Sequence, residues 1–233
     1  MKEKAPKKSE ATRARIVDIA MKLFLDQGFE KTTMREIAAA AGMAPGAAYY
    51  HFRTKDEIVF AFYESTQDGS EERARQTNKE TKDFAERIKD IIEFKLTQLD
   101  EYREFLGQLA SHALVPKSPL SPFSEEAGDV RIRAIAIFQD AISDSDLKIA
   151  KELVSHLPRL LWLYQMAIIL YWLHDSSINQ VQTKKLIAVS QSIIMKSIAL
   201  SRVPILRQLN RTLLSLLELF PNKAKEKKEY GNG

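Results

Sequence analysis

The feature that most constrains the fold is the stretch from Thr33 to Lys55, where signals for helix starts and stops lie close together. Thr33 and Glu36 have the spacing of a capping box, in which each side chain accepts a hydrogen bond from the other residue's backbone N–H. Gly42 can end that helix in the left-handed conformation, and Pro45 can begin another helix without losing a hydrogen bond. The stretch therefore predicts two short helices joined by a tight turn.

The flanking residues predict a helix on each side of this pair. Apolar residues recur at helical spacing from Ser9 to Gln27, and Gly28 is expected to end that helix. Thr54 and Glu57 repeat the capping-box spacing and open a helix that we expect to break or kink at residues 68–70, Asp-Gly-Ser. Two helices that meet through a glycine turn form a helix-turn-helix, whose second helix enters the DNA major groove.

The charge distribution agrees with a DNA-binding head. The chain has 233 residues and a net charge of +4, and the excess of basic over acidic residues lies in residues 1–55. Neutralising phosphates supplies most sequence-independent affinity for DNA, so such a head is expected to be basic. A basic arm that only aids solubility is the alternative interpretation. The adjacent helix-turn-helix favours DNA.

The remainder of the chain predicts helices and no strand, so the fold class is all-α. Three prolines between His112 and Phe123 predict a loop there. Pro158 either kinks one long helix or separates two. The predicted helices span 82–112, 125–143, 146–157, 159–174, 178–202 and 204–220.

Composition and the chain ends exclude several classes of protein. The chain contains no cysteine, which excludes disulfides, thiolate metal sites and cysteine nucleophiles. Residues 1–8 are predicted to be a disordered basic arm, without the apolar segment of a signal peptide, and residues 221–233 a disordered tail. The apolar run from Leu160 to Leu173 is shorter than the roughly 20 residues that span a bilayer. We therefore expect a cytoplasmic protein without a membrane partner.

From about Thr12 to Tyr63 the chain resembles the DNA-binding domain of the tetracycline-repressor (TetR) family of bacterial regulators. The most specific part is the run G-x-x-x-G-x-x-Y-Y-H-F-x-x-K, from Gly42 to Lys55. The residues that carry the resemblance are Ile16, Ala20, Phe24, Gly28, Phe29, Thr33, Ile37, Ala38, Ala41, Gly42, Gly46, Tyr49, Tyr50, His51, Phe52, Lys55, Glu57 and Ile58.

The resemblance implies a three-helix DNA-binding domain at residues 9–55. It implies that Arg35 contacts a base, that Thr33 and Lys55 contact phosphates, and that Gly46 lets the main chain approach the duplex closely. Phe52 is expected to pack against the first helix. The implied DNA-binding residues are Thr33, Arg35, Ala44, Pro45, Gly46, Ala47, Tyr49, Tyr50, His51 and Lys55.

Three alanines depart from the family's usual pattern. Ala44 stands where a capping serine is common, Ala47 where a hydroxyl often contacts DNA, and Ala48 where a larger aliphatic residue packs. We therefore predict an operator that is read largely through backbone contacts, apolar contacts and DNA shape.

The resemblance also implies that residues 56–220 form a helical domain for effector binding and dimerisation. Helices 159–174 and 178–202 are apolar on more than one face, which suits either a core or a subunit interface, and the family implies a homodimer through them. An unidentified small molecule is expected to bind this domain and release the repressor from a palindromic operator. Candidate pocket residues are Tyr102, Phe105, His112, Phe123, Phe138, His156, Trp162, Gln165, Met166 and Tyr171.

Two alternatives remain at the level of sequence. One is a DNA-binding architectural protein without an effector. The other is an all-helical metalloenzyme. A di-iron site in a helical bundle would need Glu and His three residues apart. Glu152 and His156 are instead separated by four positions, and no second such pair accompanies them. We therefore expect no enzyme activity, no metal and no cofactor.

Overall fold

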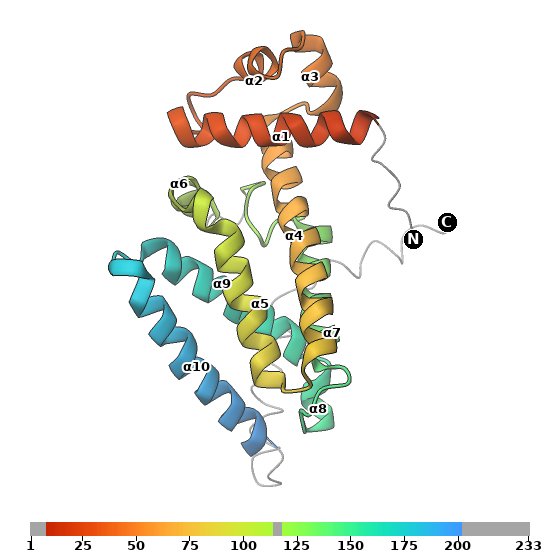
Figure 1. Cartoon of the computed structure of the whole chain (residues 1–233), viewed down its shortest axis with the longest axis vertical. Coiled ribbons are helices and arrows are strands. Elements are labelled where there is room, and N and C mark those ends of the chain that lie inside the picture. Colours follow the sequence, from red (N-terminus) through yellow and green to blue (C-terminus); the bar gives the residue numbers. More distant parts are fainter. Residues whose placement is uncertain (1–7, 114–117, 202–233) are drawn as a thin grey trace. The chain divides into compact units, whose positions relative to one another are not determined.

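The computed structural model describes residues 8–113 and 118–201, and within them it contains helices and no strand (Figure 1). The prediction of an all-α fold is confirmed. The helices are α1 (Lys8–Gln27), α2 (Met34–Ala40), α3 (Pro45–His51), α4 (Lys55–Glu80), α5 (Phe84–Leu99), η1 (Asp100–Tyr102), α6 (Arg103–Ala113), α7 (Gly128–Ile142), α8 (Lys151–Val154), α9 (Leu157–His174), η2 (Ile178–Gln180) and α10 (Val181–Leu200).

The chain forms two compact units. Among the described residues, unit 1 comprises 8–66, 99–113 and 118–127, and unit 2 comprises 67–98 and 128–201. Unit 1 includes α6 because aromatic rings attach this helix to α1: Phe105 stacks on Phe24 with 5.5 Å between ring centroids. The boundaries of these units differ from those of the predicted domains 9–55 and 56–220. The functions assigned to those two domains stay predictions.

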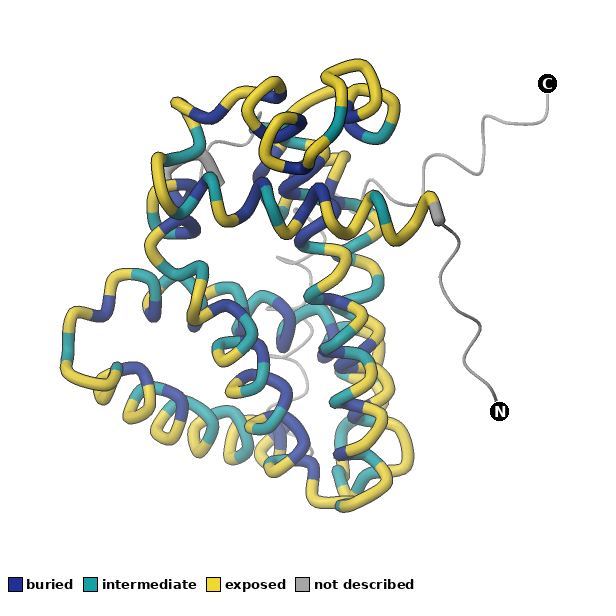
Figure 2. Tube along the Cα trace, turned by 45° about the horizontal axis from the view of Figure 1, so that its top comes forward, coloured by how far each residue is buried: buried dark blue, intermediate teal, exposed yellow. Residues whose placement is uncertain are grey.

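The core of unit 2 is a cluster of buried apolar side chains from several helices. Phe138 of α7 is completely buried, and Leu161 and Trp162 of α9 lie in the same cluster. Buried and exposed positions alternate along the helices, as amphipathic packing requires (Figure 2). The other main members are Phe84, Ile88, Ile91 and Ile92 of α5 and Ile187 and Ile198 of α10.

The predicted break at residues 68–70 is wrong, because α4 is continuous from Lys55 to Glu80. Ser70 is buried and its hydroxyl is hydrogen-bonded to Gln98 Oε1 at 2.8 Å. A Cβ on Gly69 would overlap Gln98 Nε2, which is the end of a flexible side chain that can move aside, so the packing of α4 on α5 does not depend on glycine here. Tertiary packing thus outweighs the low helix propensity of this segment.

Two other predicted helices are also wrong in extent. The predicted helix 82–112 is divided into α5, η1 and α6, and its two halves pack in different units. Of the predicted helix 146–157, only Lys151–Val154 and Leu157, the first residue of α9, are helical. Asp146 instead pairs with the start of α5: its carboxylate accepts from Phe84 N at 3.0 Å and its N–H donates to Lys82 O at 2.9 Å.

The remaining boundaries differ less from the predictions. Pro158 lies in the first turn of α9, after α8 has ended, so it separates two helices. The helix predicted from residue 178 begins at Val181, because Asn179 and Gln180 have left-handed φ values of 52° and 50°. The predictions for residues 1–7, 204–220 and 221–233 lie outside the described residues.

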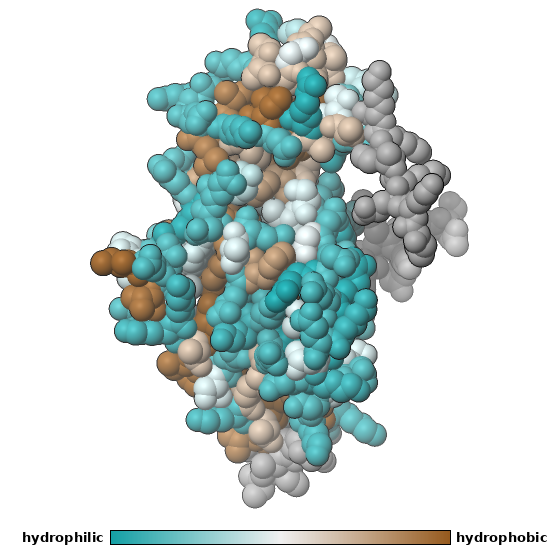
Figure 3. All heavy atoms as spheres, viewed as in Figure 1, coloured by the Kyte–Doolittle hydropathy of each residue, from teal (hydrophilic) through white to brown (hydrophobic). Residues whose placement is uncertain are grey.

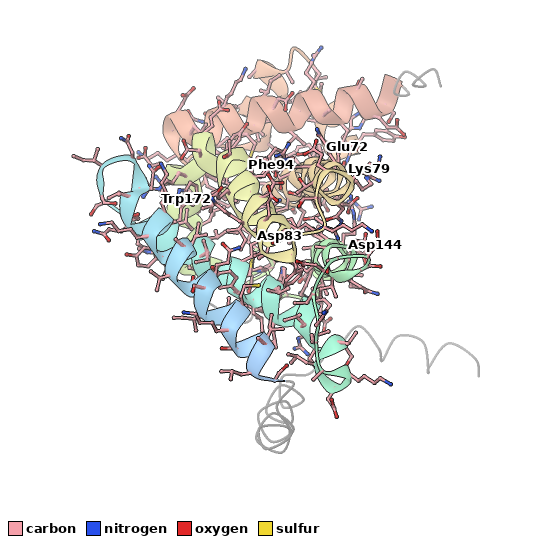
Figure 4. The ribbon with its side chains drawn as sticks, turned by 60° about the horizontal axis from the view of Figure 1, so that its bottom comes forward. Glu72, Lys79, Asp83, Phe94, Asp144 and Trp172 are labelled. Carbon is pink, nitrogen blue, oxygen red and sulfur yellow. The ribbon has the colours of Figure 1, made fainter. Side chains whose placement is uncertain are left out.

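Arg87 joins three helix ends inside unit 2. The side chain of this α5 residue is 1% exposed. Its guanidinium donates to Asn78 O and Thr81 O, at 2.8 Å each, at the end of α4, and to Ala141 O and Ser143 O, at 3.0 and 2.9 Å, at the end of α7. A cation at two helix C-termini also complements their dipoles. Figure 4 marks the neighbouring Lys79, Asp83 and Asp144 on the three segments that meet here.

Asp175 holds the turn between α9 and α10. Its carboxylate accepts hydrogen bonds from the backbone N–H and hydroxyl of Ser177, and from the same two groups of Thr183 at 2.8 and 2.7 Å. The hydrogen bonds from the Ser177 and Thr183 side chains, strengthened by those from their backbones, place the pKa of Asp175 far below its ordinary value. The ionised carboxylate therefore stabilises the α9–α10 turn.

We expect this carboxylate to make stability depend on acid pH. The unfolded chain takes up a proton at Asp175 near pH 3.9, whereas the folded chain does so only at lower pH. The stabilisation is therefore fully present above the unfolded pKa and is lost as pH falls from there toward the lower pKa of the folded chain. Asp175→Asn should lower the melting temperature by several degrees at pH 7 and by less at pH 3. Thermal unfolding at both pH values measures this. Asp144→Asn, at an exposed carboxylate, is the control, and an equal loss at both pH values would contradict the assignment.

Candidate nucleic-acid interface

The helix-turn-helix folds through local signals. Thr33 Oγ1 accepts from Glu36 N at 3.3 Å and Glu36 Oε2 accepts from Thr33 N at 2.7 Å, so the predicted capping box is confirmed. Hydrogen bonds from Thr33, first from its backbone, lower the pKa of Glu36. Gly42 is left-handed with φ of 65°, and Met43 N donates back to Ala38 O at 3.0 Å, which closes the turn before α3.

The inner face of α3 holds it against α1. Ala48 is completely buried and Phe52, which follows the helix, is 1% exposed. The guanidinium of Arg13, from α1, lies 4.7 Å from the centroid of the Phe52 ring. The predicted packing role of Phe52 is confirmed. Ala44 makes no side-chain cap, so α3 starts at Pro45 without one.

The outer face of α3 is exposed, and its first residues have small side chains. Pro45, Gly46 and Ala47 are exposed, and they are followed by Tyr49 and Tyr50, whose exposed fractions are 47% and 83%. A Cβ on Gly46 would meet no atom within 4 Å. The packing within the chain therefore does not require glycine at this position. The close approach of another molecule to the backbone of α3 would require glycine at this position.

The other predicted DNA contacts differ in how free their side chains are. Arg35 is exposed on α2, and within the described residues no hydrogen bond or ion pair holds it. Lys55 is engaged: its ammonium donates to Phe29 O and Glu30 O and lies 4.4 Å from the Phe29 ring centroid. Thr33 is exposed with its hydroxyl in the capping box, and His51 is half-buried against the Tyr50 ring.

The structure separates the basic residues of unit 1 into two groups. Arg13 and Arg15 stabilise the fold, because Arg13 packs on Phe52 and Arg15 donates to Ala41 O at the end of α2. Lys31 and Arg53 are exposed at the two ends of the helix-turn-helix, and in the described chain their side chains have no partner. Both cations lie next to helix caps, and this position is the signal in the sequence that could have indicated them.

The predicted pocket residues do not gather in one unit. Tyr102, Phe105 and Phe123 belong to unit 1, where Phe105 packs on Phe24 and the Tyr102 ring lies 4.6 Å from that of Phe62. The side chain of His112 lies outside the described residues. The members in unit 2 are Phe138, Trp162 and Gln165, which are buried, His156 and Met166, which are half-buried, and Tyr171, which is exposed. The pocket stays a prediction.

Helices α9 and α10 expose apolar side chains. The hydroxyls of Tyr164 and Ser190 join the two helices at 2.8 Å. Apolar atoms reach the surface along α10 (Figure 3). The exposed apolar residues of this pair and its turn are Tyr171, Ile178, Val181, Val189, Ile193 and Leu200, with exposed fractions from 41% to 85%. We call Tyr171, Val181, Val189, Ile193 and Leu200 the α9–α10 face.

Two observations concern a membrane-spanning protein and a metalloenzyme. Within residues 8–113 and 118–201, no helix combines the length and apolar character needed to cross a membrane. Among the same residues, no three His, Asp or Glu side chains gather as metal ligands, so the metalloenzyme alternative gains no support.

Two family models match the chain. The model "Bacterial regulatory proteins, tetR family" matches residues 16–62, and the model "Tetracyclin repressor-like, C-terminal domain" matches residues 87–214. The regulator AcrR of Shigella flexneri is 39% identical over 64 residues, which are 28% of this chain and 30% of AcrR. TtgR of Pseudomonas putida is 34% identical over 80 residues, 34% of this chain and 38% of TtgR. These matches thus cover only about a third of either relative.

Solved structures share the fold over most of the chain. A TetR regulator from Nitrosomonas europaea has a TM-score of 0.63 at 18% identity, covering 78% of this chain and 97% of that one. FadR from Bacillus halodurans has a TM-score of 0.62 at 17% identity, covering 83% and 97%. FadR from Thermus thermophilus, in complex with lauroyl-CoA, has a TM-score of 0.51 at 18% identity, covering 76% and 93%.

Proposed function

The chain belongs to the tetR family of bacterial regulatory proteins, and we propose that it is a homodimeric repressor that leaves a palindromic operator when a small molecule binds unit 2. The observation that most supports DNA binding is the outer face of α3. It is exposed, its first residues are small, and its glycine has no packing function within the chain. A helix of this kind can lie close to base edges in the major groove.

We propose that operator recognition combines apolar contacts with phosphate contacts. Ala47 and the rings of Tyr49 and Tyr50 can contact thymine methyl groups. Arg35 is the candidate base contact, and Lys31 and Arg53 are candidates for phosphates, because the fold does not engage their side chains. Lys55 can contribute to the local potential while it holds the turn at Phe29.

Dimerisation through the α9–α10 face would place two copies of α3 on one duplex. The face exposes apolar side chains from two helices, which suits burial against a second copy. A two-fold dimer contacts half-sites about 34 Å apart, one turn of DNA. The proposed operator is therefore a palindrome.

The effector belongs to unit 2 in this proposal. Its core is apolar and built from several helices, so an apolar ligand group could replace part of the packing. Thermus thermophilus FadR, which shares the fold, binds lauroyl-CoA. We therefore propose acyl-coenzyme A thioesters as the first compounds to test. Release from the operator requires only that the effector bind one state of the dimer more tightly than the other. Such a difference in binding free energy is typically about 1 to 3 kcal/mol.

Gly46→Ala tests the assignment of α3. Alanine at this helical position meets no neighbour, so we expect stability to be unchanged or to rise by up to about 1 kcal/mol. We expect affinity for an operator, selected by the wild-type protein from random DNA, to fall about tenfold, because the added methyl group keeps the backbone from the duplex. Thermal unfolding and fluorescence anisotropy measure the two effects.

Gly107→Ala is the matched control. Gly107 lies in α6, and a Cβ there also meets no atom within 4 Å. This variant should gain similar stability and bind the operator like the wild type. If Gly46→Ala also bound like the wild type, α3 would not be the reading helix. If no duplex were selected at low ionic strength, DNA binding itself would be excluded.

A further inference from the structure

Helix α3 has few means of its own to fix its orientation. It contains seven residues, and its N-cap residue, Ala44, makes no side-chain hydrogen bond. The backbone of Ala44 is extended, as at helix starts that a serine or an aspartate caps, but alanine has no acceptor to offer there. The buried residue of the helix, Ala48, is small. A helix as short as this depends on contacts from neighbouring elements for its position.

An arginine of α1 holds the turn before α3. Arg15 Nη2 donates a hydrogen bond to the carbonyl oxygen of Ala41, the C-cap residue of α2. The same nitrogen lies 3.9 Å from the position that a Cβ on Gly42 would occupy, so the guanidinium lies against the turn itself. Carbonyl groups at the end of a helix lack donors within the helix, and a cation there also complements the helix dipole. Arg15 therefore ties the turn to α1.

A second arginine of α1 holds the other end of α3. The guanidinium of Arg13 lies over the ring of Phe52, which is the C-cap residue of α3 and is 1% exposed. Arg13 Nη1 also lies 3.5 Å from Glu64 Oε2 of α4. Both side chains of this ion pair are nearly half exposed, so the pair adds little stability and serves mainly to orient the guanidinium. Both ends of α3 are thus held by α1, which lies next to it (Figure 1).

Their charge alone would assign both arginines to phosphate contacts. The structure distinguishes them from Arg53, which is exposed and, in the part of the chain that the structure describes, has no side-chain partner. Loss of a phosphate contact weakens binding to every duplex alike and lowers the dependence of affinity on salt. A change in the orientation of the reading helix instead weakens the contacts that distinguish one sequence from another. The two functions therefore predict different measurements.

We propose that Arg13 and Arg15 are positioning residues, which fix the orientation of α3 for operator reading. They compensate for what Ala44 and Ala48 do not provide, a side-chain cap and a large packing residue. This rests on the proposed function, in which α3 is the reading helix. Contacts to base edges depend on placement of the side chains to within about 0.5 Å, so a small tilt of α3 weakens them.

The first test compares Arg15→Met with Arg53→Met in the full-length protein. Fluorescence anisotropy measures affinity for the selected operator and for a duplex of shuffled sequence, between about 50 and 200 mM NaCl. Arg15→Met should weaken operator binding about tenfold, with the shuffled duplex affected less than about twofold and the salt slope unchanged. Arg53→Met should weaken both duplexes equally and reduce the salt slope by about 1. Arg13→Met should behave like Arg15→Met.

Lys22→Met is the matched control for the loss of a positive charge from α1. Lys22 is exposed on the same helix, and within the described residues it makes no hydrogen bond or ion pair. This variant should bind both duplexes like the wild type. Circular dichroism and thermal unfolding show that each variant is folded at the temperature of the binding measurement.

A double-mutant cycle then tests whether Arg15 acts on the start of α3. Ala44→Ser introduces the side-chain acceptor that the helix lacks. In the wild type this change should alter operator affinity less than about twofold, whereas in Arg15→Met it should restore most of the loss, because the cap and the arginine act on the same turn. Arg15→Lys, which keeps a donor for Ala41 O, should retain part of the affinity.

Three results would overturn the proposal. Equal losses on both duplexes with a reduced salt slope would make Arg15 a phosphate contact. Lower thermal stability with wild-type operator affinity would make its function purely structural. An effect of Ala44→Ser that is the same with and without Arg15 would show that the arginine does not act on the start of α3.

Failure of the proposed function is distinguishable from failure of this proposal. If Gly46→Ala bound the operator like the wild type, α3 would not be the reading helix, and the proposal would fail with that assignment. If Gly46→Ala weakened operator binding and Arg15→Met did not, α3 would remain the reading helix and only the positioning function would be refuted.

Discussion

Ile193→Asp should convert the protein to a monomer and lower operator affinity by at least about a hundredfold, because two half-sites would no longer be bound together. Ile193 is 59% exposed on α10, and Val189, one turn earlier, is 61% exposed. In the proposed dimer this face packs against a second copy. An aspartate on each copy would bring two carboxylates into an apolar interface, where burying a charge without a partner is costly.

Sedimentation equilibrium gives the oligomeric state, and fluorescence anisotropy with the selected operator gives the affinity. Ile132→Asp is the control, because Ile132 is 50% exposed on α7, outside the α9–α10 face, and its replacement should change neither property. A dimeric Ile193→Asp protein would show that another surface joins the subunits. A monomeric variant with full operator affinity would remove dimerisation from the proposed function.

Arg87→Met should lower the free energy of unfolding by about 3 to 5 kcal/mol, because hydrogen bonds from a charged donor contribute on the order of 1.5 to 3 kcal/mol each and burying methionine costs less than burying arginine. The guanidinium donates to four backbone carbonyls from the ends of α4 and α7. Methionine has similar length but no donor, so the buried oxygen of Ala141 and three part-buried oxygens lose their partner. The two helix ends also lose a cation next to their dipoles.

Urea denaturation measures this change. Lys89→Met is the control, because Lys89 is an exposed α5 residue and its ion pair with Glu93 is long, at 4.0 Å. Its replacement should change stability by less than about 1 kcal/mol. Arg87→Lys should recover only part of the loss, because one ammonium group cannot reach both helix ends. A loss below about 1 kcal/mol for Arg87→Met would show that the carbonyls find other donors.

Where the sequence predicted the structure well, the signals were local. The capping box at Thr33, the left-handed turn at Gly42 and the start of α3 at Pro45 each depend on residues within one or two helical turns. Such signals act in the same way whatever the rest of the chain does. The three helices of the head were therefore predicted nearly to the residue.

The predictions failed where a distant partner determines the backbone. The Asp-Gly-Ser segment at residues 68–70 is a breaker by composition, yet Gln98 and Arg133 hold it within α4. Asp146 was expected to be helical, yet its side chain binds the start of α5. In each case a contact between residues far apart in sequence outweighed a local preference of about 1 kcal/mol.

The same distinction applies to the candidate interface. Residue types at helical spacing predicted that α3 is the reading helix, but they did not distinguish exposed cations from those that stabilise the fold. Lys55 proved to bind carbonyl groups near Phe29, whereas Lys31 and Arg53 were left exposed. The candidate pocket was similarly chosen by residue type, and the structure distributes its members over two units.

The amino-acid sequence alone determined the all-helical class and the helix-turn-helix, because helix caps, glycine turns and apolar periodicity act over a few residues. The family followed from the resemblance of residues 12–63 to known regulators, which the family models matched. Only the tertiary structure decided that α4 is unbroken, that α6 packs with the head, and which charges are buried at helix ends. Those outcomes depend on packing and hydrogen bonds between residues distant in the chain, which no local pattern records.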